Sequence, residues 1–148
     1  MNKYFKIDDP TIVTISREYS ASAELAFDAW LDAENAGKWL FATPDGEMKR
    51  VEIDAQVGGK FRFDELRGDE LVEHTGEYLE IDRPNKLAFS FDDTNLNSRS
   101  IVIIEIVPTE IGCRLTLTHE FGQELVNYLD DLKMGWGHIV NNIAPFIE

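Results

Sequence analysis

Apolar residues recur at helical spacing along the last part of the chain, residues 123–148. The members of this stripe are Leu125, Leu129, Leu132, Trp136, Val140 and Ile143, with Ile139 beside them. Such spacing predicts one long amphipathic helix whose apolar face needs a wide partner surface. Gly135 interrupts the helix next to Trp136 at a cost of about 1 kcal/mol relative to alanine, which suggests close packing or room for a ligand there.

Earlier segments alternate between apolar and polar residues with a period of two, the pattern of strands that are buried on one face. We expect strands over residues 11–19, 48–53, 60–64, 70–81, 86–91, 100–107 and 113–119, with a bulge near Gly76. Residues 92–98 are polar and are predicted to form a loop. Two short helices are expected after the first strand, one of about ten residues with its N-cap among residues 20–22 and one over residues 33–40.

The resulting order is one strand, two short helices, a run of strands joined by short turns, and one long helix. This order predicts an α+β fold in a single domain over residues 1–148, with a curved antiparallel sheet of about seven strands wrapped around the C-terminal helix. The arrangement is a helix-grip fold, with space for a pocket between the sheet and the helix.

Charge and composition narrow the classes of partner. The chain has 14 basic and 28 acidic residues, a net charge of −14, so nucleic acid is not an expected partner. Its 43% hydrophobic content excludes wholesale disorder, and no apolar run approaches the roughly 18–20 residues that cross a membrane. The first residues lack the apolar segment of a secretory signal, and the single cysteine, Cys113, fits a reducing compartment, so we expect a cytoplasmic protein.

Residue patterns that carry catalysis or metal binding are missing from the sequence. The three histidines, His74, His119 and His138, are not joined by any metal-ligand spacing, and no nucleophile or phosphate-loop motif occurs. Most acidic residues of 64–82 alternate with apolar ones and are interpreted as the solvated face of strands. The sequence therefore predicts no catalytic residue, no metal and no cofactor, and favours a protein that is not an enzyme.

Aromatic and apolar residues on the predicted strands and helices could line the pocket. The candidates for the lining are Trp39, Phe61, Phe63, Tyr78, Phe89, Phe91, Leu117, His119, Leu132 and Trp136. His119 is in phase with Leu115 and Leu117, so it should face inward. There it either contacts a ligand or is satisfied by a group of the protein itself, and the tryptophans are either pocket walls or core fillers.

Several stretches resemble the family of homologues of the activator of the heat shock protein 90 ATPase, within the START-like superfamily. They are residues 15–30, 57–63, 76–84 and 115–119, and the pairs Lys38-Trp39 and Gly135-Trp136. The resemblance implies a cavity between sheet and C-terminal helix that commonly takes apolar small molecules. The eukaryotic co-chaperone stimulates the ATPase through a separate N-terminal domain, for which 148 residues leave no room, so direct ATPase stimulation is not expected.

Three hypotheses for function follow. The first is a domain that binds a small apolar or amphipathic molecule, the second is a chaperone-interacting protein, and the third is a cyclase-like or hydrolase-like enzyme. The sequence leaves open whether the protein is a monomer or a homodimer. Ile101 and Ile103 would face away from the core, where either a second subunit or a covering loop of the same chain could pack on them.

Overall fold

One antiparallel sheet of seven strands dominates the computed structural model, which describes residues 2–93 and 96–148. The strands are β1 (Thr11–Tyr19), β2 (Glu47–Ile53), β3 (Lys60–Arg67), β4 (Glu70–Asp82), β5 (Lys86–Asp93), β6 (Ser98–Pro108) and β7 (Cys113–Phe121). Their spatial order is β1-β7-β6-β5-β4-β3-β2, so β2 to β7 form a meander and β1 joins its far edge beside β7. Residues 94 and 95 of the predicted loop lie outside the described residues.

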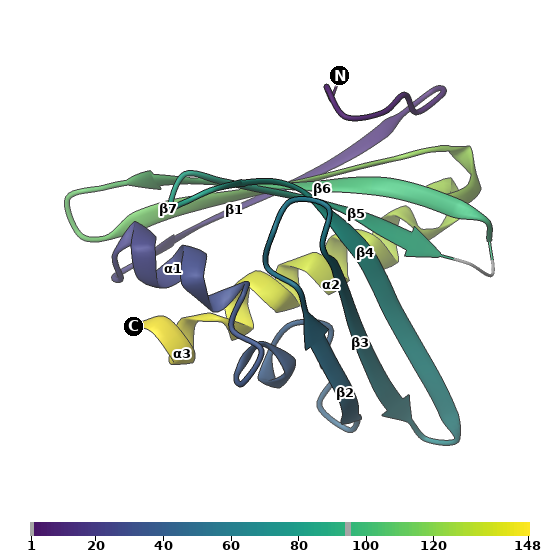
Figure 1. Cartoon of the computed structure of the whole chain (residues 1–148), viewed down its shortest axis with the longest axis horizontal. Helices are drawn as coiled ribbons and strands as arrows, with labels where there is room; N and C mark the ends of the chain where they lie inside the picture. Colours follow the sequence, from purple (N-terminus) through teal and green to yellow (C-terminus); the bar gives the residue numbers. More distant parts are fainter. Residues whose placement is uncertain (1, 94–95) are drawn as a thin grey trace.

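The helical elements lie against one face of this sheet (Figure 1). They are α1 (Ala23–Ala29), the short 3-10 helices η1 (Ala36–Lys38) and η2 (Gln123–Tyr128), α2 (Leu129–Asn142) and α3 (Ala144–Ile147). The sheet curves over α2, so the predicted α+β helix-grip fold is confirmed. Ser22 caps α1 as expected, because its hydroxyl accepts a hydrogen bond from the Leu25 amide.

The C-terminal helix differs from the single element predicted over residues 123–148. It begins as η2 and is divided again at Ile143, between α2 and α3. Pro145 lies in the first turn of α3 and has no amide hydrogen to continue the ladder of α2. The Arg17 guanidinium, on β1, donates instead to the carbonyl oxygen of Asn141 at 3.1 Å, which satisfies the end of α2.

The irregular part of β4 lies slightly beyond the predicted position. Its register against β5 shifts between Tyr78 and Glu80, whereas the sequence suggested a bulge near Gly76. At Gly76 the neighbouring strand comes so close that an added Cβ would lie 1.9 Å from the Ser90 carbonyl oxygen. Glycine is therefore required there for the approach of two strands.

The concave face of the sheet and the helices enclose the core, in which Cys113 and all three tryptophans are buried. The opposite face is partly covered by residues 2–7, the purple segment above the sheet in Figure 1. Asn2 donates to the Glu120 carboxylate, and the Arg99 guanidinium lies 4.6 Å from the centre of the Phe5 ring. Of the two isoleucines predicted to face away from the core, Ile101 is fully buried within the chain itself and Ile103 is half-buried.

Gly135 lies on the exposed side of α2, and an added Cβ would meet no atom within 4 Å. The expectation that this glycine marks close packing was wrong. Spacing alone could not separate the two faces here, because Gly135 is adjacent in sequence to the buried Trp136.

Replacing Gly135 with alanine is expected to stabilise the protein. Alanine has higher helix propensity and restricts the unfolded chain, so Gly135→Ala should raise the free energy of unfolding by about 0.5–1 kcal/mol in urea denaturation. The matched change Gly76→Ala should lower it by about 1–3 kcal/mol, because the new methyl group collides with the neighbouring strand. Destabilisation by Gly135→Ala would mean that the open surface at this position is wrong.

Candidate functional site

The space between the sheet and the helices is an aromatic-lined cavity that is almost filled. Its lining residues are Trp30, Leu40, Phe41, Phe61, Phe63, Tyr78, Leu87 and Phe89, and its volume is about 10 Å3. That volume holds about one water molecule, whereas pockets for small molecules span roughly 300–1,000 Å3. In this conformation the protein's own side chains occupy the place that the sequence assigned to a ligand.

The predicted lining residues fall into three groups. Phe61, Phe63, Tyr78 and Phe89 line the cavity from β3, β4 and β5. The rest of the predicted set, Phe91, Leu117, His119, Leu132 and Trp136, belongs to the surrounding core without lining the cavity itself.

Trp39 forms the third group and is separate from this cavity. Its ring packs edge-on against Trp30 with 4.9 Å between the ring centres. It lines a surface groove of about 520 Å3 between α1, η1 and α3, together with the partly exposed Leu25 and Phe146. Within the described residues the indole N–H groups of both Trp30 and Trp39 are buried without a hydrogen-bond acceptor.

The candidates drawn from the sequence missed four lining residues, Trp30, Leu40, Leu87 and Phe41. Of these, Phe41 has the most unusual backbone. It follows η1 in a loop, and its backbone has a φ of 60°, in the left-handed region that side chains other than glycine rarely adopt. Only 6% of its surface is exposed. The one available signal was the run of three large apolar residues before the Thr43-Pro44-Asp45-Gly46 turn, since three consecutive residues cannot share one helix face.

His119 faces inward as predicted and is satisfied by the protein itself. The indole N–H of Trp136 donates to His119 Nδ1 at 3.0 Å, so the neutral ring carries its proton on Nε2. Nε2 lies 2.8 Å from the Ser100 hydroxyl oxygen, and this hydroxyl donates to the Phe91 carbonyl oxygen at 2.9 Å. The chain of hydrogen bonds ties α2 to β7, β6 and β5.

Burial lowers the pKa of His119 to about 3, so the imidazole is neutral at physiological pH. A neutral histidine with both ring nitrogens engaged is a structural element of the core. It has no free proton or lone pair with which to act as an acid or base in this arrangement.

His74, on β4, also faces the interior and borders Phe41. Its ring stacks on that of Phe41 with 4.6 Å between centres, and its Nδ1 lies 3.2 Å from the Phe63 carbonyl oxygen. Because a carbonyl only accepts, Nδ1 carries the proton and Nε2 is an acceptor. Burial lowers the pKa of His74, which favours this neutral form.

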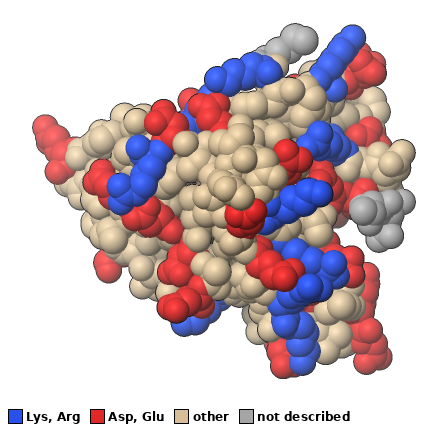
Figure 2. All heavy atoms as spheres, in the orientation of Figure 1, with Lys and Arg blue, Asp and Glu red and all other residues tan. Residues whose placement is uncertain are grey.

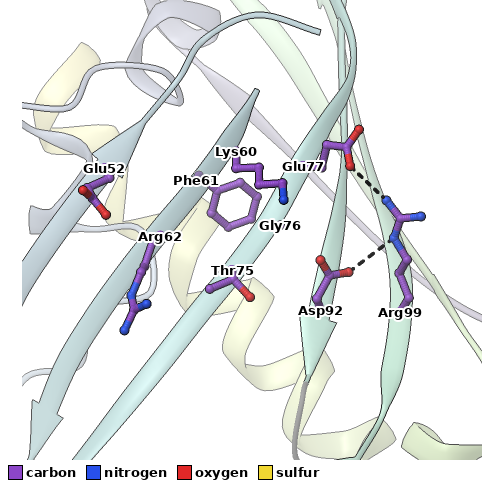
Figure 3. A pocket seen from close by; sticks show the side chains of 9 residues that line it. All are labelled: Glu52, Lys60, Phe61, Arg62, Thr75, Gly76, Glu77, Asp92 and Arg99. Atoms are coloured by element: carbon purple, nitrogen blue, oxygen red, sulfur yellow. Dashed lines mark hydrogen bonds and ion pairs between the residues drawn. The ribbon is translucent and has the colours of Figure 1, made fainter. Parts of the chain in front are cut away.

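A second hollow, of about 550 Å3, lies on the outer face of the sheet over β3, β4, β5 and β6 (Figure 3). Its charged lining residues are Glu52, Lys60, Arg62, Glu77, Asp92 and Arg99. Arg99 lies within 3.5 Å of both Glu77 and Asp92, and Arg62 pairs with Asp64 and Glu73. Three positive and three negative side chains thus line a polar basin, in contrast to the mostly apolar pockets that hold small molecules.

Across residues 2–93 and 96–148, no three His, Cys, Asp or Glu side chains converge as metal ligands would. No helix in the described part of the chain is both long and apolar enough to span a bilayer. On the face shown in Figure 2, acidic and basic side chains are interspersed.

The model of the family described as "Activator of Hsp90 ATPase homolog 1-like protein" matches residues 20–148 of this chain. The chain belongs to this family. The match includes α1, β2 to β7 and the C-terminal helices, and therefore every residue that lines the interior cavity. No curated protein matches the chain.

Solved structures of bacterial proteins have the same fold. A protein of Chromobacterium violaceum is 26% identical, with a TM-score of 0.79 and coverage of 93% of this chain and 97% of its own. The AHSA1-like protein of Aeromonas hydrophila is 21% identical, with a TM-score of 0.78 and coverage of 92% and 91%. A protein of unknown function from Staphylococcus aureus is 17% identical, with a TM-score of 0.79 and coverage of 90% of both chains.

The buried His119 should make stability depend on pH. The unfolded chain binds a proton on this residue near pH 6.5 and the folded protein only near 3. The stability is therefore complete above pH 6.5 and falls by up to about 1.4 kcal/mol per unit as the pH drops towards 3. His74 adds a loss of the same sign.

Urea denaturation at about pH 7.5 and about pH 5.5 isolates the histidines, because ordinary carboxyl groups remain mostly ionised over this range. His119→Gln, whose amide can replace both hydrogen bonds, should reduce the difference in unfolding free energy between the two pH values. His74→Gln serves as the comparison, with a smaller reduction expected. An unchanged pH difference in His119→Gln would contradict the assignment.

Proposed function

We propose that this domain binds a small apolar or amphipathic molecule in the interior between the sheet and α2. The observation that carries the proposal is the composition of the cavity lining, which is apolar and aromatic throughout. One of these residues, Phe41, comes from a loop and not from the sheet or a long helix. The buried Trp30 N–H, which has no acceptor among the described residues, offers a polar contact to an amphipathic ligand.

In this proposal the predicted lining residues have distinct roles. Phe61, Phe63, Tyr78 and Phe89 provide the sheet wall of the site, and Trp136, on α2, packs behind it against Phe41 with 6.0 Å between the ring centres. His119 acts indirectly, by holding the Trp136 ring in place through its hydrogen bond. Trp39 supports the site from outside by packing against Trp30.

Naphthalene, a neutral two-ring probe, is expected to bind in this interior. In nuclear magnetic resonance spectra of the protein, it should shift the side-chain signals of Phe63, Leu87 and Phe89, which line the cavity but not the outer basin. The outer basin is the internal control, so signals of Thr75 and Gly76 near its rim should move less. Shifts confined to the outer basin, or to the groove around Trp39, would contradict binding in the interior.

A second candidate function is association with a chaperone. The family description names an activator of the Hsp90 ATPase, and the net charge of −14 favours a basic protein surface. Binding to purified heat shock protein 90 should then be detectable at about 50 mM salt and weaker at about 500 mM, because salt screens attraction between exposed charges. No association at the lower salt concentration would exclude this candidate.

A further inference from the structure

Phe41 fills the centre of the interior from a loop. Its ring lies nearly parallel to those of His74, Phe91 and Phe61, with interplanar angles of 10°, 13° and 13°. It meets Phe63 and Trp136 at steep angles of 76° and 65°. Phe41 thus occupies a flat slot whose floor is the sheet and whose side is α2.

The loop that carries Phe41 is held against β3 through the carboxylate of Glu65. Glu65 Oε2 accepts hydrogen bonds from the Thr43 amide at 2.7 Å and from the Thr43 hydroxyl at 3.1 Å. Arg67 pairs with the other carboxylate oxygen and also donates to the Phe41 carbonyl oxygen at 3.4 Å. Glu65 is 1% exposed, whereas Thr43 lies on the exposed tip of the loop.

Two further features belong to this fastening. Gly46 closes the loop over the same carboxylate, since an added Cβ would lie 2.1 Å from Glu65 Oε2. Although burial by itself would raise the pKa of Glu65, the Thr43 amide and Arg67 hold it below its usual value, so the carboxylate is ionised at neutral pH. Charge-assisted hydrogen bonds of this kind are stronger than neutral ones.

We infer that Phe41 is a removable plug and that a flat aromatic molecule takes its place in the slot. The contacts of Glu65 with Thr43 and Arg67 are the latch that holds Phe41 in. This inference rests on the proposed function and specifies its ligand class and its control. The left-handed backbone at Phe41 favours release, because such a conformation persists only while surrounding contacts enforce it.

The slot selects the ligand by its flat shape. Nearly parallel rings on its floor favour a planar ring system that stacks as Phe41 does. His74 presents the face of its ring to the slot, because the Phe41 ring stacks on it with 4.6 Å between the ring centres. The expected ligand is therefore a neutral aromatic molecule of one or two rings.

Calorimetric titration with 2-naphthol tests the latch. Glu65→Gln keeps the shape of the side chain but removes its charge, and Thr43→Val removes one hydrogen bond to it. Each should tighten binding by about threefold to tenfold, because opening the loop then breaks weaker contacts. Glu73→Gln is the matched control, since it removes a carboxylate paired with Arg62 on the outer face and should leave the affinity unchanged.

Phe41→Gly tests the plug. It removes the ring and relieves the left-handed backbone, so it should bind 2-naphthol more tightly than either latch variant. Adding Glu65→Gln to Phe41→Gly should give no further gain, because no plug remains to be released.

The outcomes separate this inference from the proposed function. If the wild-type protein binds 2-naphthol in its interior but the latch variants do not change the affinity, the latch is refuted and the binding function stands. A gain from Glu65→Gln that persists in Phe41→Gly also refutes the latch. If no variant binds either probe, Phe41→Gly included, both proposals fail.

Discussion

The concave face of the sheet carries large apolar side chains, and the rest of the structure depends on keeping water away from them. Each such side chain is worth about 1.5–3 kcal/mol when fully buried. Three parts of the chain provide the cover: α2 lies against β1, α1 against β6 and β7, and the loop with Phe41 over the aromatic rings of β3 to β5. The first two are helices with regular backbone hydrogen bonds. The third depends on side-chain contacts.

Covering the sheet also buries polar groups, and two of them, His119 and Glu65, find their hydrogen-bond partners in different ways. His119 is neutral, lies between Trp136 and Ser100, and joins a helix to the middle of the sheet. Opening these contacts would leave several buried polar atoms without partners, which makes the link permanent. Glu65 is charged, and its partner Thr43 lies on the surface, where water can replace it. The same need for satisfied polar groups thus produces one rigid link and one that can be released.

The difference between the rigid His119 link and the releasable Glu65 link matters for how a ligand could enter the filled interior of this fold. A cavity of about 10 Å3 stores no ligand, but Phe41, one of the residues that line it, belongs to the least regular of the three covering parts. The outer basin is larger, yet charged side chains line it, and Arg99 there is paired with Glu77 and Asp92. Volume alone would therefore favour the outer basin, whereas the proposed function rests on the apolar lining of the interior.

The sequence by itself determined the sheet, the helix-grip arrangement and the inward direction of His119, because periods of two and of 3.6 report which face of an element is buried. It also identified most of the aromatic wall. Only the tertiary structure decided that Pro145 divides the C-terminal helix, that Gly135 faces outward, and that Trp39 lies outside the cavity. It alone brought Phe41 against His74 and Glu65 against Thr43. Contacts between a loop and distant strands leave no periodic trace in a sequence, since they depend on how the packed elements place the loop in space.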